Sequence, residues 1–520
     1  MTQRFPSTNV GTALQDAFDW FARLVGRWFE IDLRALAAFR ISLGLLLIVD
    51  LVARSRSLGA FYTDSGVLPR EALFSDYTNV YSLHAISGAA WAQTVLFCIA
   101  GAFALALVVG YRTRIATIVS WLLLVSLHIR NPMILNSGDV LLRMLLFWGI
   151  FLPLDETWSV SAEHSERDST TVASIATMAL LLQVVFMYVT NTVHKFRGEL
   201  WMDGEALVHI MSADQFTVLL GNTLAEYHSL LELINYLWIA LILASPLLFV
   251  LTGRARTILP TLFVGMHLGM LVTMRIGLFP LVVVAALLPF YPSVVWDAVS
   301  DLVSRAGITD ALRSSKERFS ARLPNPPAPA TGIDAPDVPN WSAVVGGGRT
   351  VFFTLIPYLM LALVVMSNAQ AVDYGEVPDP GEQVLETTQA DQSWRMFAPS
   401  PARTTRWFAA AGTLENGSEI DVLHKSRVDL ERPENVESTY RSARWRKYLS
   451  NVQSASNENH RSYLANHLCD RWNRQHETGI TNVTVYHVFE RVDPYSGERE
   501  AYGRIQLIDY DCSGKFVQHH

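Results

Sequence analysis

Long apolar stretches fill the first two-thirds of this 520-residue chain, and they constrain its fold more than any other feature of the sequence. A helix needs about 20 consecutive, mostly apolar residues to cross a bilayer. Nine segments approach or reach that length: 35–53, 89–109, 114–129, 139–154, 172–194, 235–252, 257–274, 277–295 and 350–371. Charged residues make up 17% of the chain, whereas about 25% is usual for a soluble protein. We therefore predict an α-helical polytopic membrane bundle with about nine spans.

The remaining sequence divides into segments of different composition. In residues 14–33 aromatic and charged side chains alternate at helical spacing, which is typical of a helix lying in the membrane interface. Residues 323–340 are rich in proline and alanine and are expected to form an extended linker. The predicted order is an interfacial amphipathic helix at 1–33, the membrane domain at 34–296, a loop with the Pro-rich linker at 297–349, a last transmembrane helix at 350–371 and a soluble domain at 372–520.

The soluble C-terminal part shows both strand-like and helix-like patterns. Apolar and polar residues alternate at 404–412, 418–424, 483–491 and 501–509, and helical spacing occurs near 437–450 and 456–475. We therefore predict a small α+β domain with a mostly antiparallel sheet. Cys469 and Cys512 both lie in this domain and can pair if it faces an oxidising compartment. No cysteine or histidine cluster has the spacing of metal ligands, so we expect no metal.

The basic residues of the loops predict the orientation in the membrane, because short cytoplasmic loops are enriched in lysine and arginine. The loops at 111–114 (YRTR) and 253–256 (GRAR) fall on one side of a nine-span bundle, together with the long loop at 297–349. We place that side and the N-terminus in the cytoplasm, which makes residues 372–520 extracytoplasmic. The chain is thus expected to be a multi-pass protein of the cell membrane, with membrane lipids as partners. Its net charge of −7, without a long basic run, argues against a nucleic-acid partner.

Polar residues inside the predicted spans are candidates for function, because a charge at the centre of a membrane helix costs about 2.5–3.5 kcal/mol. The segment that begins at residue 139 opens with such a group, formed by Asn136, Ser137, Asp139 and, one turn later, Arg143. Two interpretations apply. Asp139 and Arg143 can form an i, i+4 ion pair, or these polar side chains can form a polar cup at the external mouth of the bundle.

A lysine lies where the fifth apolar segment ends, in the stretch TVHKFRGELW at 192–201. In one interpretation Lys195 is a boundary residue whose long stem reaches the interface, where Trp201 also lies. In the other interpretation it is a working base, because burial in an apolar bundle favours the uncharged amine of a lysine. Both interpretations are compatible with the spacing.

The stretch GMHLGMLVTMRIGLFP at 265–280 holds two more polar side chains. His267 lies well inside the seventh segment, where a lone histidine can serve as a structural hydrogen-bond partner or as part of a site. Arg275 precedes an apolar turn, and its charge there requires an anion, a carboxylate or an array of carbonyl groups.

Five motifs follow one another in the part of the chain between about residues 30 and 300: YTDSGVLPR (62–70), NSGDVLLR (136–143), DETWSV (155–160), VHKFRGELW (193–201) and HLGMLVTMRIGLFP (267–280). A sixth motif, WRMFAPSP, lies in the tail at 394–401. Together they resemble the vitamin K-dependent gamma-carboxylases and their prokaryotic relatives, the HTTM (horizontally transferred transmembrane) proteins.

The resemblance implies that Lys195 is the base of an enzyme and removes a proton from a reduced naphthoquinone, either vitamin K hydroquinone or, in a prokaryote, menaquinol. Reaction with O2 then produces the base that lets CO2 carboxylate a glutamate of a secreted protein or peptide, which the C-terminal domain would hold over the pocket. The side chains expected around this quinol and substrate pocket are Asn136, Asp139, Arg143, Trp201, His267 and Arg275.

One position departs from the family pattern. The family's catalytic histidine near the mouth of the fourth segment corresponds to Gly138 here, and His84 and His128 could replace it only if the fold brings them close. Carboxylation therefore stands beside a quinol-dependent oxygenation or another modification of a secreted peptide. The non-catalytic alternative is a membrane scaffold, or a maturation or export partner, that binds such a peptide. The two classes differ at Lys195, whose replacement by alanine should abolish the activity of an enzyme and hardly affect a scaffold.

Overall fold

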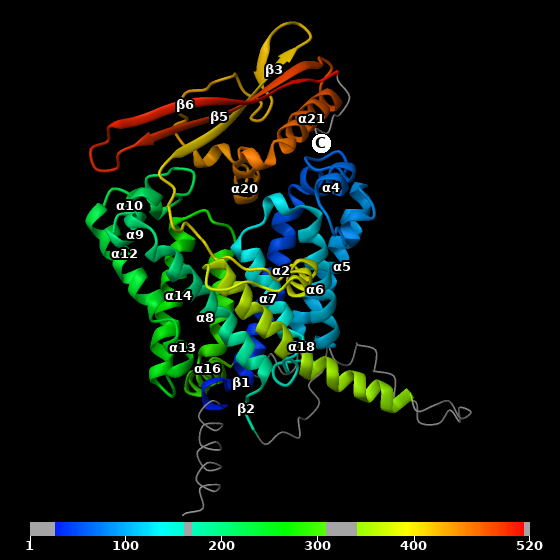
Figure 1. The fold of residues 1–520 in the computed structure, drawn as a ribbon, viewed down its shortest axis with the longest axis vertical. Coiled ribbons are helices and arrows are strands. Elements are labelled where there is room, and N and C mark those ends of the chain that lie inside the picture. The colour runs from blue at the N-terminus through cyan, green and yellow to red at the C-terminus, as the bar shows by residue number, and fades with distance from the viewer. Residues whose placement is uncertain (1–25, 161–168, 308–340, 514–520) are drawn as a thin grey trace, which may run out of the picture.

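The protein consists of a helical bundle with a smaller domain of strands and helices over one end (Figure 1). The computed structural model describes residues 26–160, 169–307 and 341–513, and of residues 341–351 only the backbone. The predicted interfacial helix at 1–33 lies largely outside the described residues, and the predicted linker at 323–340 lies wholly outside them.

Six helices within the described residues are long and apolar enough to cross a membrane, so the chain has the helices of a multi-pass membrane protein. They are α2 (Leu33–Ser55), α5 (Ala90–Val109), α6 (Thr113–Arg130), α8 (Ile175–Phe196), α14 (Ala255–Thr273) and α18 (Trp341–Ala371). The apolar part of α18 is Phe352–Ala371, close to the predicted span at 350–371.

The other three predicted spans form shorter or broken helices. These are α7 (Ser137–Gly149), α12 (His228–Leu243), and α15 (Phe279–Leu287) with η3 (Leu288–Phe290), followed by α16 (Ser293–Arg305). α7 has 13 residues and α12 has 16 residues, and the chain bends by 105° before α16. Pro292 lies at the bend, directly before α16. Proline cannot continue the hydrogen-bond ladder of a helix, so the preceding helix ends there. With the bent pair taken as one span the described residues give at most seven, so the predicted count of nine is not shown.

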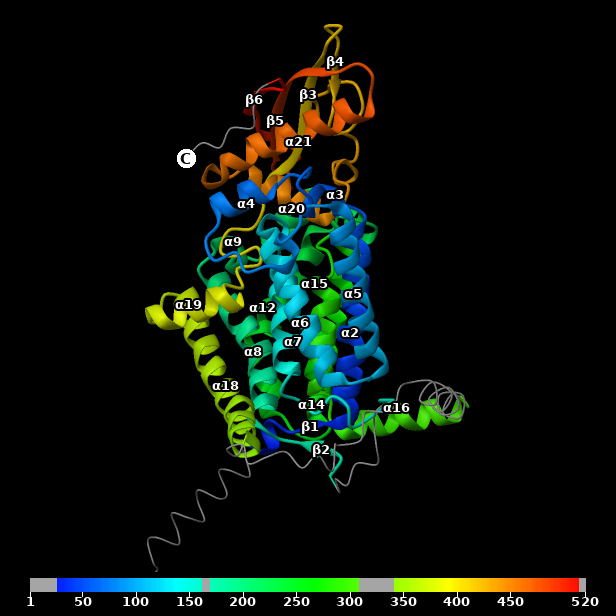
Figure 2. The same ribbon diagram turned by 90° about the vertical axis from the view of Figure 1, so that its right-hand side faces the viewer.

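The shorter helices nevertheless belong to the bundle. α7 packs against α6, α8 and α15, and α12 packs against α8 and α14. Figure 2 shows α16 leaving the bundle sideways at the end opposite to the C-terminal domain, where β1 (Ile31–Asp32) and β2 (Thr171–Val172) form a short antiparallel pair. The connecting helices are α3 (Leu58–Tyr62), α4 (Arg70–Asp76), η1 (Leu83–Ala85), η2 (Pro132–Ile134), α9 (Glu199–Met202), α10 (Ala206–Met211), α11 (Leu220–Leu224) and α13 (Leu247–Val250).

The start of α7 is held by its own first residues. The Asn136 side chain accepts hydrogen bonds from the backbone N–H groups of Gly138 and Asp139 at 2.8 and 3.3 Å. In return the Asp139 carboxylate accepts a hydrogen bond from the Asn136 N–H at 2.8 Å. Reciprocal capping of this kind satisfies N–H groups that have no partner inside the helix. It also holds the carboxylate of Asp139 at the end of the bundle that meets the C-terminal domain.

The C-terminal domain contains a four-stranded sheet in the order β4-β3-β5-β6, in which every neighbouring pair is antiparallel. The elements after α18 are α19 (Asp379–Thr388), β3 (Thr405–Leu414), β4 (Glu419–Asp421), η4 (Glu437–Thr439), α20 (Ala443–Val452), η5 (Ala455–Asn457), α21 (Asn459–Gln475), β5 (Ile480–Val492) and β6 (Arg499–Asp511). α20 and α21 lie between the sheet and the bundle (Figures 1 and 2). The prediction of helices with a mostly antiparallel sheet is thus confirmed. A disulfide joins Cys469 of α21 to Cys512 after β6.

Aromatic side chains pack the C-terminal domain onto the bundle. Trp445 of α20 packs on Phe61 of α3 with ring centroids 4.7 Å apart, and Tyr448 lies 5.9 Å from the same ring. The Trp445 Nε1–H also donates to the Ser57 hydroxyl at 3.2 Å. Because these side chains are buried, α20 is held firmly over the end of the bundle, where two cavities lie.

Candidate functional site

A cavity of about 600 Å³ lies between the bundle and the C-terminal domain. Its walls come from α8, α12 and α14, from β3 and α20, and from the stretch 391–402 that connects the two parts. Lys195 of α8 lies in its wall, and we call it the lysine cavity. Asn136, Trp201 and His267, all predicted to surround the pocket, line it too.

Lys195 lies in the last turn of α8 with only 2% of its surface exposed. Its Nζ lies 2.9 Å from the centroid of the Trp201 ring and 3.5 Å from the Met396 carbonyl oxygen. Among the residues that the structure describes, no carboxylate pairs with this amine. An aromatic face and a carbonyl group therefore hold the amine, which leaves it able to exchange a proton with a ligand.

The stretch 394–399, from the tail motif WRMFAPSP, covers this amine. The Asn191 amide donates to the Trp394 carbonyl oxygen at 2.9 Å, and the Trp201 Nε1–H donates to the Phe397 carbonyl oxygen at 3.1 Å. The motif therefore forms one wall of the lysine cavity. The resemblance includes this motif, but the sequence alone does not indicate that it lies against Lys195.

The inner end of the lysine cavity is aromatic and holds two polar atoms that have no hydrogen-bond partner in the described part of the chain. It is lined by Tyr188, Trp238, His267 and Phe279. The His267 Nδ1–H donates to the Phe263 carbonyl oxygen at 2.8 Å, which makes Nε2 an acceptor. Within the described residues neither this Nε2 nor the Tyr188 hydroxyl has a hydrogen-bond partner. Since buried polar atoms usually have partners, both atoms are available to a ligand.

The outer part of the lysine cavity is cationic. It is lined by Arg406 of β3 and by Arg446 and Lys447 of α20. Arg446 donates to the Gln215 carbonyl oxygen at 2.7 Å, and its guanidinium lies 4.5 Å from the centroid of the Phe216 ring. Burial lowers the pKa of Arg446 to about 10, which leaves it charged at neutral pH. The cavity thus suits a ligand with an apolar ring at its inner end and an anionic group at its outer end.

A second cavity of about 610 Å³ lies beside the first. The two cavities share Asn136, Phe279 and Ala443 in their walls. We call the second one the arginine cavity, because it is lined by Arg56, Arg275, Arg441 and Arg444. Asp50 and Asp139 lie in the same wall.

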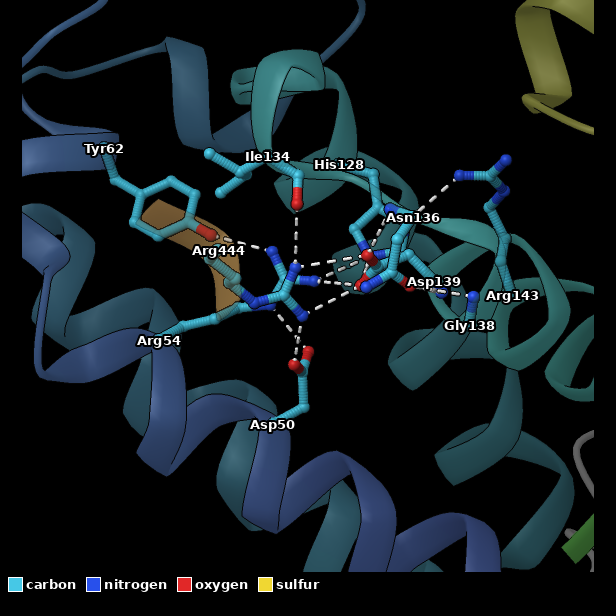
Figure 3. A network of polar contacts seen from close by, with 10 residues as sticks. All are labelled: Asp50, Arg54, Tyr62, His128, Ile134, Asn136, Gly138, Asp139, Arg143 and Arg444. Atoms are coloured by element: carbon cyan, nitrogen blue, oxygen red, sulfur yellow. Dashed lines mark hydrogen bonds and ion pairs between the residues drawn. The ribbon is translucent and has the colours of Figure 1, made fainter. Parts of the chain in front are cut away.

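A buried ion network forms one side of the arginine cavity (Figure 3). Arg444 of α20 donates to the carboxylate of Asp50 at 2.6 Å and to that of Asp139 at 2.9 and 3.1 Å. Arg54 of α2 donates to the same two carboxylates, at 2.6 Å each, and to the Tyr62 hydroxyl at 2.8 Å. Each carboxylate is therefore shared by one guanidinium from the bundle and one from the C-terminal domain.

The predicted ion pair between Asp139 and Arg143 is absent from the described contacts. Asp139 caps the start of α7, and its carboxylate therefore faces Arg54 and Arg444. Arg143 points away from it and donates to His128 Nδ1 at 3.0 Å. Arg143 lines neither of the two cavities. It contacts the network through His128, whose other ring nitrogen lies 3.1 Å from Arg54.

Arg275 lies in the turn between α14 and α15 and pairs with the Glu437 carboxylate of the C-terminal domain. It also donates to the carbonyl oxygens of Glu437 and Arg441 at 3.3 and 3.4 Å. The carboxylate and carbonyl groups that its charge requires thus come from the C-terminal domain. Arg275 and Asp139 line the arginine cavity, and the structure does not bring them into the lysine cavity.

Two glycines allow close contacts that shape the site. A Cβ on Gly198 would collide with the backbone of Pro399, so only glycine lets the tail approach α8 here. A Cβ on Gly138 would lie 2.9 Å from the Cα of Phe279. Position 138, at which the resemblance places the family histidine, therefore has no room for a side chain in this packing.

Neither alternative histidine reaches the two cavities. His84 is buried with its Nδ1 2.8 Å from the Ser126 hydroxyl, and His128 is enclosed by Arg54 and Arg143 at 3.1 and 3.0 Å. Neither residue lines the lysine cavity or the arginine cavity. Within the described residues there is also no group of three or more His, Cys, Asp or Glu side chains that could hold a metal ion.

Sequence reasoning missed several residues of the site. Tyr188 precedes Lys195 by seven residues on α8, or about 10 Å along the helix axis, and this spacing could have identified it as a residue of the same face. Arg444 and Arg446 lie in a polar helix outside every predicted span. Nothing in the local pattern distinguishes them from other solvent-facing arginines.

Comparison with known proteins gives one match. A family model described as HTTM domain matches residues 28–296, just over half of the 520 residues. The matched range includes Lys195, His267 and the start of α7, and it excludes the C-terminal domain. No curated protein and no solved structure matches the chain.

Proposed function

We propose, from the premise that this chain belongs to the HTTM domain family, that it is a membrane enzyme resembling the vitamin K-dependent gamma-carboxylases, with Lys195 as its base. The substrate would be a glutamate in a protein or peptide, and the cofactor a reduced naphthoquinone such as menaquinol or vitamin K hydroquinone, with O2 and CO2 as co-substrates. One observation carries the proposal. The Lys195 amine is buried in the wall of a cavity and, among the described residues, has no carboxylate partner.

The inner end of the lysine cavity fits a quinol head group. The acceptor Nε2 of His267 and the Tyr188 hydroxyl can bond a ligand hydroxyl or carbonyl, while Trp238 and Phe279 offer flat apolar surfaces. The volume of about 600 Å³ lies within the range of roughly 300–1,000 Å³ that small-molecule sites occupy. A bound quinol would supply, with O2, the strong base that removes a proton from glutamate so that CO2 can add.

The residues around Lys195 would move one proton and exclude water. Nζ would take the proton of a ligand hydroxyl, and the Trp201 ring and the Met396 carbonyl group keep solvent away from it. Asn191 positions this cover through hydrogen bonds of 2.9 and 3.2 Å to the carbonyl oxygens of Trp394 and Arg395. These groups come from the bundle and from the stretch 394–396, so the surroundings of Lys195 depend on this stretch being packed against α8.

The cationic outer part of the cavity supports an acidic substrate. Arg406, Arg446 and Lys447 can bond a carboxylate, and charge-assisted hydrogen bonds of this kind are among the stronger ones in proteins. All three belong to the C-terminal domain. This placement agrees with a domain that holds a peptide over the pocket.

We further propose that the chain crosses the membrane nine times, with α7, α12 and α15 as the short crossings. The N-terminus would then be cytoplasmic and the C-terminal domain extracytoplasmic. The disulfide between Cys469 and Cys512 supports this orientation, because disulfides persist in oxidising compartments. Alkaline phosphatase fused after the C-terminal domain should be active, since this reporter matures only outside the cytoplasm. An inactive fusion would contradict the orientation.

The packing at Gly138 favours a second candidate function. Because a side chain at this position would meet Phe279, the chain has no counterpart of the family histidine there. A non-catalytic scaffold, or a maturation or export partner that binds a secreted peptide, would not need that histidine. A quinol-dependent oxygenation is the variant of the first function that this packing favours.

Lipid analysis combined with turnover tests the proposal. The full chain is purified from native membranes, copurified lipids are identified by mass spectrometry, and quinol consumption and incorporation of labelled CO2 into peptides are measured. We expect a bound naphthoquinone, and we expect Lys195→Ala to keep it while turnover falls by about 10²–10⁴-fold. Lys425→Asn is the matched control, because Lys425 is exposed and its positive φ of 62° suits asparagine.

Two results would contradict the proposal. A wild-type protein without any naphthoquinone has no quinol site, and full turnover in Lys195→Ala assigns the base to another group. Bound naphthoquinone with quinol consumption but no CO2 incorporation would replace carboxylation by oxygenation.

A further inference from the structure

The ion network beside the arginine cavity is balanced within itself. Asp50 and Asp139 supply two negative charges, and Arg54 and Arg444 supply two positive charges. Every one of these four groups contacts both partners of opposite charge at 2.6–3.1 Å. The network therefore has no spare charge for a ligand.

Two further arginines of the same cavity have no carboxylate partner in the part of the chain that the structure describes. Arg275 pairs with Glu437, but Arg56 and Arg441 pair with no carboxylate among the described residues. Arg441 donates to the Leu423 carbonyl oxygen at 3.1 Å. The exposed side chain of Arg56 has no hydrogen bond to another described residue. Two uncompensated cations therefore line the arginine cavity.

Two helix N-termini open on this cavity. The start of α20 contributes Ser442 and Ala443, and the start of α15 contributes Leu278 and Phe279. The first N–H groups of a helix carry a partial positive charge and attract anions. They add to the two guanidinium groups that have no carboxylate partner among the described residues, so the cavity as a whole favours an anion.

An exposed apolar stripe on α2 leads directly to the cavity. Leu45, Val49 and Val52 are 50%, 48% and 54% exposed, and with Arg56 they follow one another at i, i+4, i+7 and i+11 along one side of the helix. From Leu45 to Arg56 the helix rises about 16 Å. This is close to half of the roughly 30 Å hydrocarbon thickness of a bilayer. An acyl chain on this stripe would bring its phosphate group to Arg56.

We propose that the arginine cavity binds the phosphate of an anionic phospholipid, whose acyl chain lies along the stripe formed by Leu45, Val49 and Val52. Arg56 and Arg441 would contact the phosphate, and the N-termini of α15 and α20 would face it. The lipid would belong to the leaflet beside the C-terminal domain and would reinforce the contact between that domain and the bundle. This site is separate from Lys195 and does not depend on the function proposed for it.

Lipid titration of the delipidated full chain in detergent micelles tests this site. Phosphatidylglycerol, phosphatidylcholine and inorganic phosphate are added separately, and the midpoint of thermal unfolding and the number of retained lipids by native mass spectrometry are measured. We expect phosphatidylglycerol to bind more tightly than phosphatidylcholine and to raise the midpoint. The double variant Arg56→Gln/Arg441→Gln should bind phosphatidylglycerol roughly 30-fold more weakly, since each basic residue near a lipid surface contributes a factor of about five.

Two variants serve as references. Arg305→Gln removes an exposed arginine at the opposite end of the protein and should bind phosphatidylglycerol as the wild type does. Because Arg441 also supports the Leu423 backbone, Arg56→Gln alone is the variant that preserves the fold, with an expected loss of roughly 5-fold. Equal affinity of the wild type and Arg56→Gln would overturn the proposal. Equal stabilisation by inorganic phosphate and phosphatidylglycerol at the same concentration would overturn the assignment to a lipid.

Discussion

The guanidinium of Arg444, on α20 of the C-terminal domain, donates to the carboxylate of Asp50, on α2 of the bundle, at 2.6 Å across 394 residues of sequence. Arg54 donates to the same carboxylate at 2.6 Å, so Asp50 is held by both parts of the molecule. Because Arg446 and Lys447 follow Arg444 on α20, this contact also sets their position over the lysine cavity. Residues of the membrane domain and of the C-terminal domain therefore line the lysine cavity together.

Replacing Arg444 tests how strongly this contact joins the two parts. Arg444→Ala leaves two buried carboxylates with Arg54 as their only partner in the network, and loss of one partner of a buried pair usually costs about 3–5 kcal/mol. We expect a loss of this size in the free energy of unfolding, measured by denaturant titration. Arg427→Ala, at an exposed arginine of the same domain, should change it by less than about 1 kcal/mol. Equal stability of the two variants would contradict the role of Arg444.

The Tyr188 hydroxyl tests the inner end of the lysine cavity. Under the proposed function, Tyr188→Phe would remove one hydrogen bond to the quinone and should weaken its binding by roughly 2- to 10-fold. The fold should be little affected, because this hydroxyl has no hydrogen-bond partner among the described residues. The Kd of a naphthoquinone analogue is measured by fluorescence quenching. Tyr236→Phe, which removes only an exposed hydrogen bond of 2.9 Å to the Asp203 carbonyl oxygen, should leave the Kd unchanged.

The disulfide of the C-terminal domain closes a segment with a sequence separation of 43 residues. Replacing both Cys469 and Cys512 by serine should reduce the free energy of unfolding by about 2–5 kcal/mol, because an open chain has more conformational freedom when unfolded. A reductant should lower the stability of the wild type and leave this variant unaffected. Cys98→Ser is the matched control, since Cys98 is an exposed free thiol on α5. A reductant effect that persists in the double variant would contradict the role of the disulfide.

We expect His487 to make the C-terminal domain less stable in acid. Its buried ring lies between Phe408 and Phe489, with centroids 5.2 and 5.7 Å away, and burial, aided by the charge of Arg406, lowers its pKa to about 4. In the unfolded chain the pKa is about 6.5. Between these values the unfolded state binds more protons, so stability falls as the pH decreases from about 6.5 to about 4.

The variant His487→Phe should flatten this pH dependence, because phenylalanine fills the same space without titrating. Thermal unfolding midpoints between about pH 7 and pH 4 provide the measurement. Some dependence should remain, since burial also lowers the pKa of His460 and of His467 to about 4. His476→Phe, at an exposed histidine, should retain the full wild-type dependence. An identical profile for His487→Phe and the wild type would rule out His487 as a contributor.

Gly138 tests the close packing at the position where the resemblance places the family histidine. Its Cβ would lie 2.9 Å from the Cα of Phe279 and 3.0 Å from the Asn136 side-chain oxygen, so Gly138→Ala should destabilise the protein by about 1–3 kcal/mol. At Gly101, within α5, a Cβ would meet nothing within 4 Å among the described residues. Gly101→Ala should therefore stabilise the helix by about 0.5–1 kcal/mol. Denaturant titrations should therefore show a lower free energy of unfolding for Gly138→Ala and a higher one for Gly101→Ala. Changes of the same sign in both variants would contradict the close packing at Gly138.

Elements whose pattern is local were predictable from the sequence. The strand expected at 483–491 is β5, the helix expected at 456–475 is α21, and the span expected at 89–109 is α5. The span count was less predictable. The segment expected at 277–295 instead ends near Phe290 and continues at 105° in α16, because Pro289 within η3 and Pro292 after it stop the helix.

The candidate site was predictable only in part. Lys195, Asn136, Trp201 and His267 line one cavity. Arg275 lies in the neighbouring cavity, because its partner Glu437 comes from the C-terminal domain. Tyr188 could have been found from its spacing to Lys195, whereas no local pattern indicates that Arg444 is buried in the bundle.

The sequence by itself determined that the chain forms apolar helices followed by an antiparallel α+β domain, since helix and strand periodicities depend on residues only a few positions apart. Only the tertiary structure decided which polar side chains share a cavity, which of them cancel one another's charge, and that the tail covers Lys195. These relationships join residues far apart in the sequence. They depend on how the helices pack and on where the C-terminal domain docks, and neither property is encoded in any single stretch.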